Sequence, residues 1–234
     1  FGADKRVVLM FDGAMSHAQV YVNGKKVGNW PYGYNSFYFD ITKQLMPGKK
    51  NTLAVRLENL PESSRWYPGA GLYRNVHVIV TENAHIPGWG TYVTTPTATK
   101  EFAKVNVRTQ IVLLEGADAG KYSVKTSVWN PNGQKLTEQT IPLSQIKYND
   151  NSLSQEFIIQ TPTLWSPDMP ALYSAETRLY EGDQLKDIYT TPFGIRSIEI
   201  IPNKGFFLNG EKTVFKGVCN HHDLAPLGAA VNDA

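Results

Sequence analysis

Hydrophobic and polar residues alternate at every second position through most of the chain, and no long segment shows an apolar face at helical spacing. Alternation of this kind, with many β-branched and aromatic residues, is typical of half-buried β-strands. The chain is therefore predicted to be mainly β. Near its start the alternating residues flank Asn23-Gly24, a pair that favours the two-residue type I′ turn of a β-hairpin.

The spacing of the first strands predicts a two-sheet sandwich of the jelly-roll type over residues 1–84. The alternating segments are Arg6–Phe11, 18–28, 35–41, 51–59 and 73–82. A strand-like segment begins almost at once and helix-start signals occur near Asn232 and Asp233. The sequence is therefore expected to be a piece of a longer protein, with this first domain truncated at its N-terminus.

The pattern changes at Ile86–Gly90, where proline and glycine gather, and seven further strands are predicted over residues 85–198. They are Tyr92–Thr95, Lys104–Leu114, Tyr122–Trp129, Lys135–Ile141, Leu153–Ile159, Ala171–Tyr180 and Gln184–Phe193. Seven short strands in a segment of this length indicate an immunoglobulin-like β-sandwich. An antibody-type domain is excluded because the chain has a single cysteine.

Residues 199–234 break the pattern again. A short hairpin is predicted around Asn209-Gly210, followed by a strand without polar alternation at Thr213–Val218 and then by a loop and a helix start. A fully apolar strand followed by a loop and a helix is typical of the first β–loop–α unit of an α/β domain.

Composition narrows the function classes. The net charge of the 234 residues is only +2 and the Lys and Arg residues are scattered, which argues against nucleic acid and against an anionic membrane surface as partners. No apolar run reaches the roughly 20 residues that a membrane-spanning helix needs. The single cysteine, Cys219, excludes an internal disulfide framework and a zinc site with several cysteines.

The segment Arg65–Gly71 is the first candidate for chemistry. Trp66 and Tyr67, next to Arg65, could stack on a sugar ring and donate hydrogen bonds to its hydroxyls, while proline and glycine hold the loop in a tight path. A second role fits the same composition, namely a bulky plug that packs against a neighbouring domain.

The second candidate is the run of polar residues after the predicted strand at Thr213–Val218. His221, His222 and Asp223 follow the carboxyl end of that strand, where the active site of a parallel α/β barrel is built. Adjacent side chains on an extended segment point to opposite sides, so at most one histidine faces a pocket. No metal site is predicted, because neighbouring histidines ligate one ion poorly and the H-E-x-x-H spacing is absent.

Four motifs together resemble glycoside hydrolase family 2, the β-galactosidase, β-glucuronidase and β-mannosidase group. They are G-L-Y-R at Gly71–Arg74, L-W-S-P at Leu164–Pro167, F-G-I-R at Phe193–Arg196, and F-x-L-N-G-x-x-x-x-x-K-G-V at Phe206–Val218. The resemblance covers essentially the whole chain. It implies a sugar-binding jelly roll at 1–84, an immunoglobulin-like domain at 85–198, and the first βα unit of a (β/α)₈ barrel at 199–234.

The resemblance also implies a retaining glycosidase, in which one glutamate is the acid/base and a second is the nucleophile. In the family both lie further along the barrel, so no catalytic residue is expected in this chain and the chain alone is expected to be inactive. No cofactor is expected in this segment, although a Mg or Na ion, a homo-oligomer, and a periplasmic or secreted location are compatible with the longer enzyme. The expected partner is a carbohydrate substrate.

Residues 217–222 match the family pattern G-V-N-(K/R)-H-E, which places His221 where the family's sugar-contacting histidine stands. Cys219 and His222 depart from that pattern, and Asp223 follows where some members carry an acidic residue. Arg65 stands in the region where well-known members carry an acidic residue, and an arginine favours a carboxylate-bearing sugar. The W-Y-P-G-A-G form favours a β-galactosidase, with a β-glucuronidase or a non-catalytic carbohydrate-binding or adhesion module as alternatives.

Overall fold

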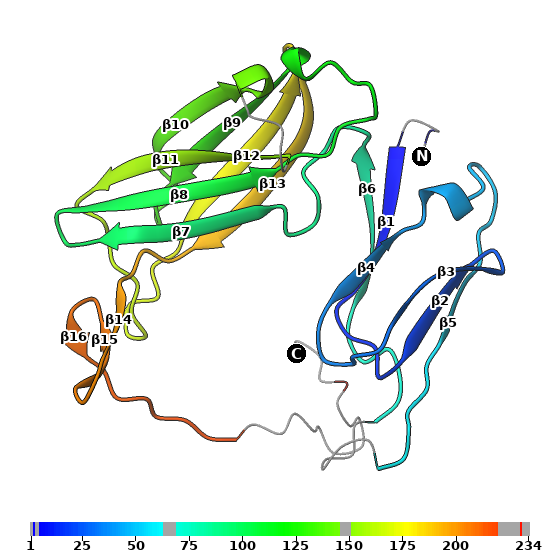
Figure 1. The fold of residues 1–234 in the computed structure, drawn as a ribbon, viewed down its shortest axis with the longest axis horizontal. Coiled ribbons are helices and arrows are strands. Elements are labelled where there is room, and N and C mark those ends of the chain that lie inside the picture. Colours follow the sequence, from blue (N-terminus) through cyan, green and yellow to red (C-terminus); the bar gives the residue numbers. More distant parts are fainter. Residues whose placement is uncertain (1, 3–4, 63–68, 146–150, 220–229, 231–234) are drawn as a thin grey trace. The chain divides into compact units, whose positions relative to one another are not determined.

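The computed structural model describes residues 2, 5–62, 69–145, 151–219 and 230. This described part consists of antiparallel β-strands and three single-turn 3₁₀ helices, so the predicted mainly-β class is confirmed (Figure 1). The chain divides into two compact units. Unit 1 comprises residues 1–82 and 217–234, and unit 2 comprises residues 83–216.

Unit 1 is a sandwich of two three-stranded sheets with the strand orders β4-β1-β6 and β3-β2-β5. Its elements are β1 (Lys5–Phe11), β2 (Ala18–Val22), β3 (Lys25–Trp30), β4 (Phe37–Asp40), η1 (Thr42–Gln44), β5 (Leu53–Arg56) and β6 (Val76–Glu82). Every strand overlaps a segment where alternation predicts one. Leu9 of β1 and Val20 of β2 are at most 1% exposed and belong to the core cluster that both sheets share.

The turn between β2 and β3 forms as predicted. Asn23 and Gly24 have φ angles of 52° and 77°, and two consecutive positive φ values are the requirement of a type I′ turn. The Asn23 side chain adds support, because its Nδ2 donates to the carbonyl of Gln44 at 2.8 Å and to Oδ1 of Asn51 at 2.7 Å. The hairpin is thereby tied to the connection between β4 and β5.

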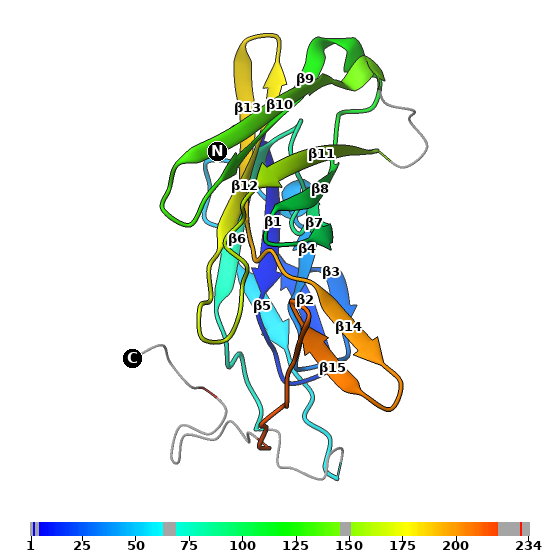
Figure 2. The same cartoon turned by 90° about the vertical axis from the view of Figure 1, so that its left-hand side faces the viewer.

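Unit 2 is a seven-stranded sandwich with the sheet orders β10-β9-β12-β13 and β11-β8-β7 (Figures 1 and 2). Its elements are β7 (Thr91–Ala98), β8 (Phe102–Gln110), η2 (Ala119–Lys121), β9 (Tyr122–Trp129), β10 (Lys135–Pro142), η3 (Leu143–Gln145), β11 (Ser152–Gln160), β12 (Tyr173–Glu181) and β13 (Gln184–Phe193). A four-stranded sheet facing a three-stranded one is the immunoglobulin-like arrangement. The seven predicted strands are all present.

Buried side chains from both sheets fill the interior of unit 2. Val105 and Phe157 of one sheet and Val128 and Ala175 of the other belong to one apolar cluster. A buried hydrogen bond also joins the sheets, from Oγ1 of Thr126 to Oε1 of Gln155, at 2.6 Å. Satisfied polar groups of this kind fix the register in which two sheets can pack.

A small third sheet follows the sandwich within unit 2. It consists of β14 (Ile198–Ile201), β15 (Gly205–Leu208) and β16 (Glu211–Lys212). The turn between the last two strands is Asn209-Gly210, with φ angles of 54° and 81°, so the hairpin predicted there is confirmed.

The strand predicted at Thr213–Val218 is not formed. These described residues take part in no strand pairing, and Val214, Phe215 and Val218 are 73%, 74% and 93% exposed. A parallel barrel strand is held by hydrogen bonds to neighbours on both sides and is buried on both faces. No described strand offers that pairing, the segment has no regular secondary structure, and the start of a barrel is not confirmed.

Candidate functional site

The five residues predicted to line a substrate pocket lie outside the described residues. They are Arg65, Trp66, Tyr67, His221 and Asp223. The chain is described up to Glu62 and again from Gly69, so the structure shows how the end of the aromatic segment is anchored in unit 1.

Gly71 is the first anchor after the aromatic segment. Its N–H donates to the carbonyl of Met15 at 3.2 Å, and the N–H of Met15 donates to the carbonyl of Gly71 at 3.0 Å. The φ of Gly71 is 138°, which a residue with a Cβ rarely adopts. Met15 is only 3% exposed, so the chain leaving the aromatic segment is fixed to a buried part of the β1–β2 connection.

Tyr73 is the second anchor. Its hydroxyl donates to the carbonyl of Gly33 at 2.8 Å. Its ring lies against Gly13, where a Cβ would come within 2.7 Å of the ring. Glycine at this position therefore permits the close approach that seats the Tyr73 ring on the β1–β2 connection.

Two further tyrosines, Tyr32 and Tyr34, join Tyr73 in what we call the tyrosine cluster. Their rings meet edge to face with centroids 5.6 Å apart. Burial raises the pKa of Tyr73, Arg74 opposes the rise with its positive charge, and Tyr34 and Tyr32 add to it. The guanidinium carbon of Arg74 lies 5.5 Å from the centroid of the Tyr73 ring.

The tyrosine cluster has the chemistry of a carbohydrate-binding surface. Tyr32 is 57% exposed, and an exposed tyrosine presents both a flat apolar ring and a hydroxyl that donates or accepts hydrogen bonds. Sugar rings are held by that combination of stacking and polar contacts. Sequence reasoning missed Tyr32 and Tyr34, and the only local signal was a Tyr-Gly-Tyr loop between two strands.

In the described part of the chain, no group of three or more His, Cys, Asp or Glu side chains could hold a metal ion. No helix among the same residues combines the length and apolar character needed to cross a bilayer.

In unit 2, three of the four motifs meet around Trp165. The N–H of Trp165 donates to the carbonyl of Ile195 at 2.8 Å, which joins L-W-S-P to F-G-I-R. The side chain of Asn209 donates to the carbonyl of Trp165 at 3.0 Å and accepts from the N–H of Ser197 at 3.0 Å. A Cβ on Gly194 would lie 2.9 Å from Trp165, so glycine is required for this packing.

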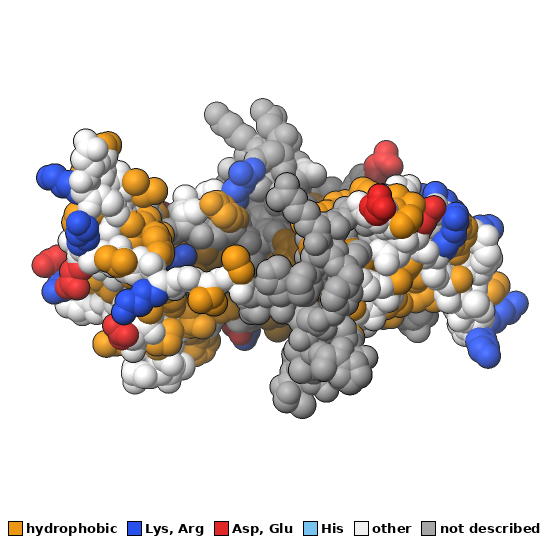
Figure 3. Space-filling model, turned by 90° about the horizontal axis from the view of Figure 1, so that it is seen from below, with side chains coloured by type: hydrophobic (Ala, Val, Ile, Leu, Met, Phe, Trp, Pro, Cys, Tyr) orange, Lys and Arg blue, Asp and Glu red, His pale blue; other side chains and the backbone are white. Residues whose placement is uncertain are grey.

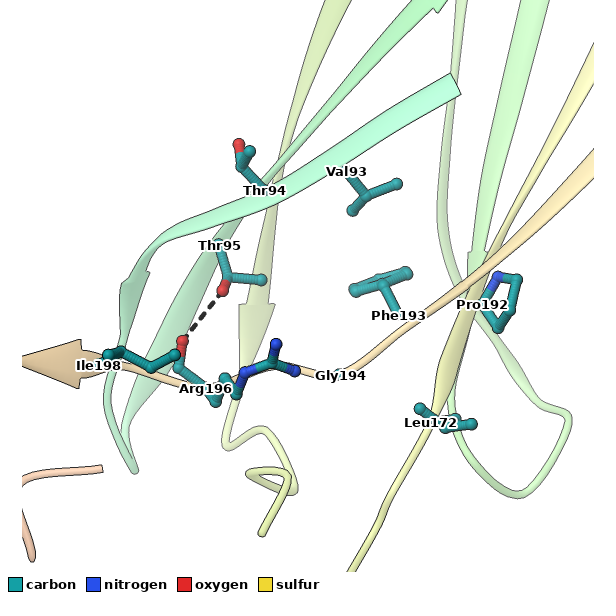
Figure 4. A pocket seen from close by; sticks show the side chains of 9 residues that line it. All are labelled: Val93, Thr94, Thr95, Leu172, Pro192, Phe193, Gly194, Arg196 and Ile198. Atoms are coloured by element: carbon teal, nitrogen blue, oxygen red, sulfur yellow. Dashed lines mark hydrogen bonds between the residues drawn. The ribbon is translucent and has the colours of Figure 1, made fainter. Parts of the chain in front are cut away.

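Beside this junction lies an open pocket of about 580 Å³ (Figure 4). Its lining consists of Val93, Thr94, Thr95, Leu172, Pro192, Phe193, Gly194, Arg196 and Ile198. The hydroxyl of Thr95 donates to the carbonyl of Arg196 at 3.1 Å. The guanidinium of Arg196 lies over the Trp165 ring, and no salt bridge to it is found among the described residues. The pocket lining thus combines apolar side chains, two threonines and one arginine.

Hydrophobic side chains gather on the face of unit 2 seen in Figure 3, at the left of that view. On the third sheet, Ile198 and Ile200 are 55% and 78% exposed, and Leu172 beside the pocket is 52% exposed. An exposed apolar patch of this kind is typical of an interaction surface rather than of a free monomer.

Two models of known protein families match this chain, one in each of its two parts. The family described as glycosyl hydrolases family 2 matches residues 84–196, and the glycosyl hydrolase 2 galactose-binding domain-like family matches residues 1–69. Of the two units in the structure, the first thus resembles a galactose-binding domain and the second the β-sandwich of the same family.

Relatives of known activity align along nearly the whole chain. The β-galactosidase BoGH2A of Bacteroides ovatus is 39% identical over 231 residues, which are 98% of this chain and 27% of the relative. A β-glucuronidase of Bacteroides fragilis is 32% identical over 244 residues, covering 97% of this chain and 34% of the relative. The chain therefore spans about a third or less of the length of these relatives.

Solved structures agree with this result. A glycosyl hydrolase family 2 member from Bacteroides cellulosilyticus matches with a TM-score of 0.90 and 35% identity, covering 97% of this chain and 29% of that one. A β-glucuronidase from Bacteroides uniformis matches with a TM-score of 0.84 and 28% identity, covering 99% and 29%.

Proposed function

Because the chain belongs to glycosyl hydrolase family 2, we propose that it is part of a retaining exo-β-glycosidase that removes terminal β-linked sugars. The observation that carries this proposal is the match of both parts of the chain, in order, to domains of one glycosidase family. The two catalytic glutamates lie outside residues 1–234 in this proposal, one as acid/base and the other as nucleophile.

This chain contributes walls of the substrate pocket. Arg65, Trp66 and Tyr67 form its rim, and the bonds of Gly71 and Tyr73 hold the end of that segment at a fixed place in unit 1. A rim fixed in advance loses less conformational freedom when substrate binds. His221 and Asp223 reach the sugar hydroxyls from the first loop of a (β/α)₈ barrel, whose first strand forms from Thr213–Val218 once the other barrel strands are present.

A β-galactosidase is the preferred form of this proposal. The W-Y-P-G-A-G sequence at residues 66–71 favours it, and a β-galactosidase is among the relatives with the highest identity, at 39%. A β-glucuronidase is the second candidate, because Arg65 could pair with the carboxylate of a uronic acid and several relatives carry that name.

The proposal is tested with nitrophenyl β-galactoside and nitrophenyl β-glucuronide. The chain of residues 1–234 should hydrolyse neither, whereas the longer protein should release nitrophenol from one of them with retention at the anomeric carbon. Turnover by residues 1–234 alone would contradict the placement of the catalytic glutamates. Hydrolysis of the glucuronide but not of the galactoside would favour the β-glucuronidase over the β-galactosidase.

His221→Ala in the longer protein tests the pocket wall. Hydrogen bonds to sugar hydroxyls strengthen in the transition state, so kcat/KM should fall roughly 100-fold. His222→Ala is the matched control, since neighbouring side chains on an extended segment are expected to point to opposite sides. An unchanged kcat/KM in the first variant would remove His221 from the site.

Titration of residues 1–234 with galactosides distinguishes a non-catalytic carbohydrate-binding module from part of an enzyme pocket. A complete binding module should show millimolar or tighter affinity, about −4 kcal/mol. Part of an enzyme pocket should show no saturable binding in that range.

A further inference from the structure

The outer face of the four-stranded sheet of unit 2 has a hollow of about 330 Å³. It lies over β9, β12 and β13, which are neighbours in that sheet (Figure 1). Strands β9 and β12 are paired on both sides, so the hollow does not arise from a missing strand. Its lining consists of Trp129, Asn130, Pro131, Gly133, Leu172, Ser174, Glu176 and Thr190.

The strand register brings the aromatic and polar members of the lining together. Ala175 of β12 points into the core, so Ser174 and Glu176 on either side of it point to the outer face. Ser174 lies opposite Trp129 of β9, and Glu176 lies opposite Thr190 of β13. Such paired residues share a face and have Cβ atoms about 5 Å apart. One indole, one carboxylate and two hydroxyls therefore meet on a small area of the sheet.

Several polar groups of the hollow are available to a ligand. The hydroxyls of Ser174 and Thr190 make no hydrogen bond to any described residue. Oε1 of Glu176 lies 2.9 Å from the guanidinium of Arg178, which leaves Oε2 with no partner among the described residues. A hydroxyl both donates and accepts, whereas a carboxylate only accepts, so the set matches a ligand that carries hydroxyl groups.

The charges around the hollow are matched within the sheet. Glu176 is paired with Arg178. Glu138, in the same cross-strand row, is held by Lys125 and Lys135 at 2.9 and 2.8 Å. A charged ligand would have to break or oppose these pairs. A neutral ligand does not, so the site favours a neutral, hydroxyl-rich molecule.

Apolar surface completes the hollow. Pro131 and Leu172, which is 52% exposed, line it together with the half-buried indole of Trp129. The β9–β10 turn that contains Pro131 is fixed, because Oδ1 of Asn130 accepts from two main-chain N–H groups of the turn at 3.0 and 2.9 Å. Aromatic and apolar surface with a few well-placed polar groups is the composition of a sugar-binding site.

We propose that this hollow, called the Trp129 site, binds one neutral sugar unit of a carbohydrate chain. The apolar face of the sugar ring packs on the indole, and the sugar hydroxyls bond to Ser174, Glu176 and Thr190. The inference rests on the proposed function in one respect, namely that the bound chain is the substrate whose terminal β-linked sugar the longer protein removes. The Trp129 site then keeps the chain bound between successive removals.

Calorimetric titration of residues 1–234 with a linear β-linked galactotetraose tests the binding. The parent chain should bind saturably in the millimolar range, whereas methyl β-galactoside, which fills a single sugar position, should not. Trp129→Ala should weaken the binding roughly 10-fold through loss of the aromatic surface. Thr190→Ala should weaken it roughly 5-fold through one lost hydrogen bond. Trp89→Ala and Thr140→Ala are the matched controls, since both side chains are exposed and lie outside the lining.

Two results of this titration would overturn the proposal. One is the absence of saturable binding of the tetrasaccharide by the parent chain. The other is equal binding by the parent, Trp129→Ala and Thr190→Ala. If Trp129→Ala fails to fold, Thr190→Ala decides alone, because its exposed side chain does not support the core.

Kinetics of the longer protein separate this proposal from the proposed function. Thr190→Ala should raise KM for a soluble β-galactan roughly 5-fold and leave kcat/KM for nitrophenyl β-galactoside unchanged. If the longer protein hydrolyses neither substrate, the proposed function fails, while the titration of residues 1–234 still decides the sugar site. An unchanged KM for the galactan, together with weakened binding in residues 1–234, would show that another part of the protein covers the hollow, and would overturn its role in holding the substrate.

Discussion

The guanidinium of Arg196 stacks over the indole ring of Trp165, with its central carbon 5.0 Å from the ring centroid. The two residues belong to different motifs, F-G-I-R and L-W-S-P, and a main-chain hydrogen bond between Trp165 and Ile195 holds those motifs together. Arginine over tryptophan is the most favourable cation–π pair, worth about 0.5–1 kcal/mol at an exposed site. The stack therefore orients Arg196 at the pocket more than it stabilises unit 2.

Gly194→Ala should destabilise unit 2. The new Cβ would lie 2.9 Å from Cβ and Cγ of Trp165, so the indole must move away from its seat beneath Arg196. Overpacking of this kind lowers the free energy of unfolding by about 1–3 kcal/mol. The loss can be measured by urea unfolding followed by tryptophan fluorescence. Gly88→Ala is the matched control, because nothing lies within 4 Å of a Cβ there, and its midpoint should not change. Equal midpoints for the two variants would contradict the packing role of Gly194.

Asn209→Ala should separate the third sheet from the sandwich of unit 2. The variant loses the hydrogen bonds to Trp165 and Ser197, and each loss costs about 1 kcal/mol. It also places a non-glycine, non-asparagine residue at a φ of 54°.

Asn203→Ala controls for the backbone strain in that experiment. Asn203 has a φ of 62° in the same small sheet, and the described structure shows no hydrogen bond of its side chain. The difference in unfolding free energy between the two alanine variants isolates the side-chain bridge, and we expect about 2 kcal/mol. A difference near zero would show that the bridge contributes nothing to stability.

The strands of both units could be predicted because alternation is a local property of the sequence. The Asn23-Gly24 and Asn209-Gly210 turns could be predicted for the same reason, since asparagine and glycine adopt positive φ values more readily than other residue types. The strand predicted at Thr213–Val218 is not confirmed, because an apolar run acquires strand structure only when other strands pair with it, and those partners are not among the described residues.

Contacts between distant residues were not predictable. Neither the seat of Tyr73 on Gly13 nor the stack of Arg196 on Trp165 leaves a periodic signal, because each joins loops that only the fold brings together. The same holds for Tyr32, which lies forty-one positions before Tyr73 and comes near enough to raise its pKa only in the tertiary structure. The predicted pocket residues Arg65, Trp66, Tyr67, His221 and Asp223 lie outside the described residues and stay predictions.

Tyr73→Phe should loosen the anchor of the aromatic segment. The variant keeps the ring against Gly13 but leaves the carbonyl of the buried Gly33 without its donor, which costs about 1 kcal/mol of unit 1 stability. In the longer protein KM should rise more than kcat falls, since positioning of the substrate rim is affected and the catalytic groups are not. Tyr21→Phe is the control on the same unit, because it loses a hydroxyl bond to Gln19 away from the aromatic segment. An equal rise of KM in that variant would rule out a specific anchoring role for Tyr73.

Unit 2 should lose stability in acid through Glu138. Hydrogen bonds from Lys135 and Lys125, with Nζ–carboxylate distances of 2.8 Å and 2.9 Å, lower the pKa of Glu138 to about 2. The pKa in the unfolded chain is about 4.3, so the folded state binds the proton less tightly. The stabilising contribution is then fully present above about pH 5 and is lost as the pH falls towards 2.

Glu138→Gln removes this contribution and should flatten the dependence of unfolding free energy on pH between 5 and 2. Addition of 1 M NaCl should shrink the difference between the variant and the parent, because the pairs are open to solvent and are screened by salt. Glu199→Gln is the control, since no described cation pairs with Glu199 and its curve should run parallel to the parent. Parallel curves for Glu138→Gln would mean that the two lysines hold the carboxylate no more strongly in the folded state than water does in the unfolded chain.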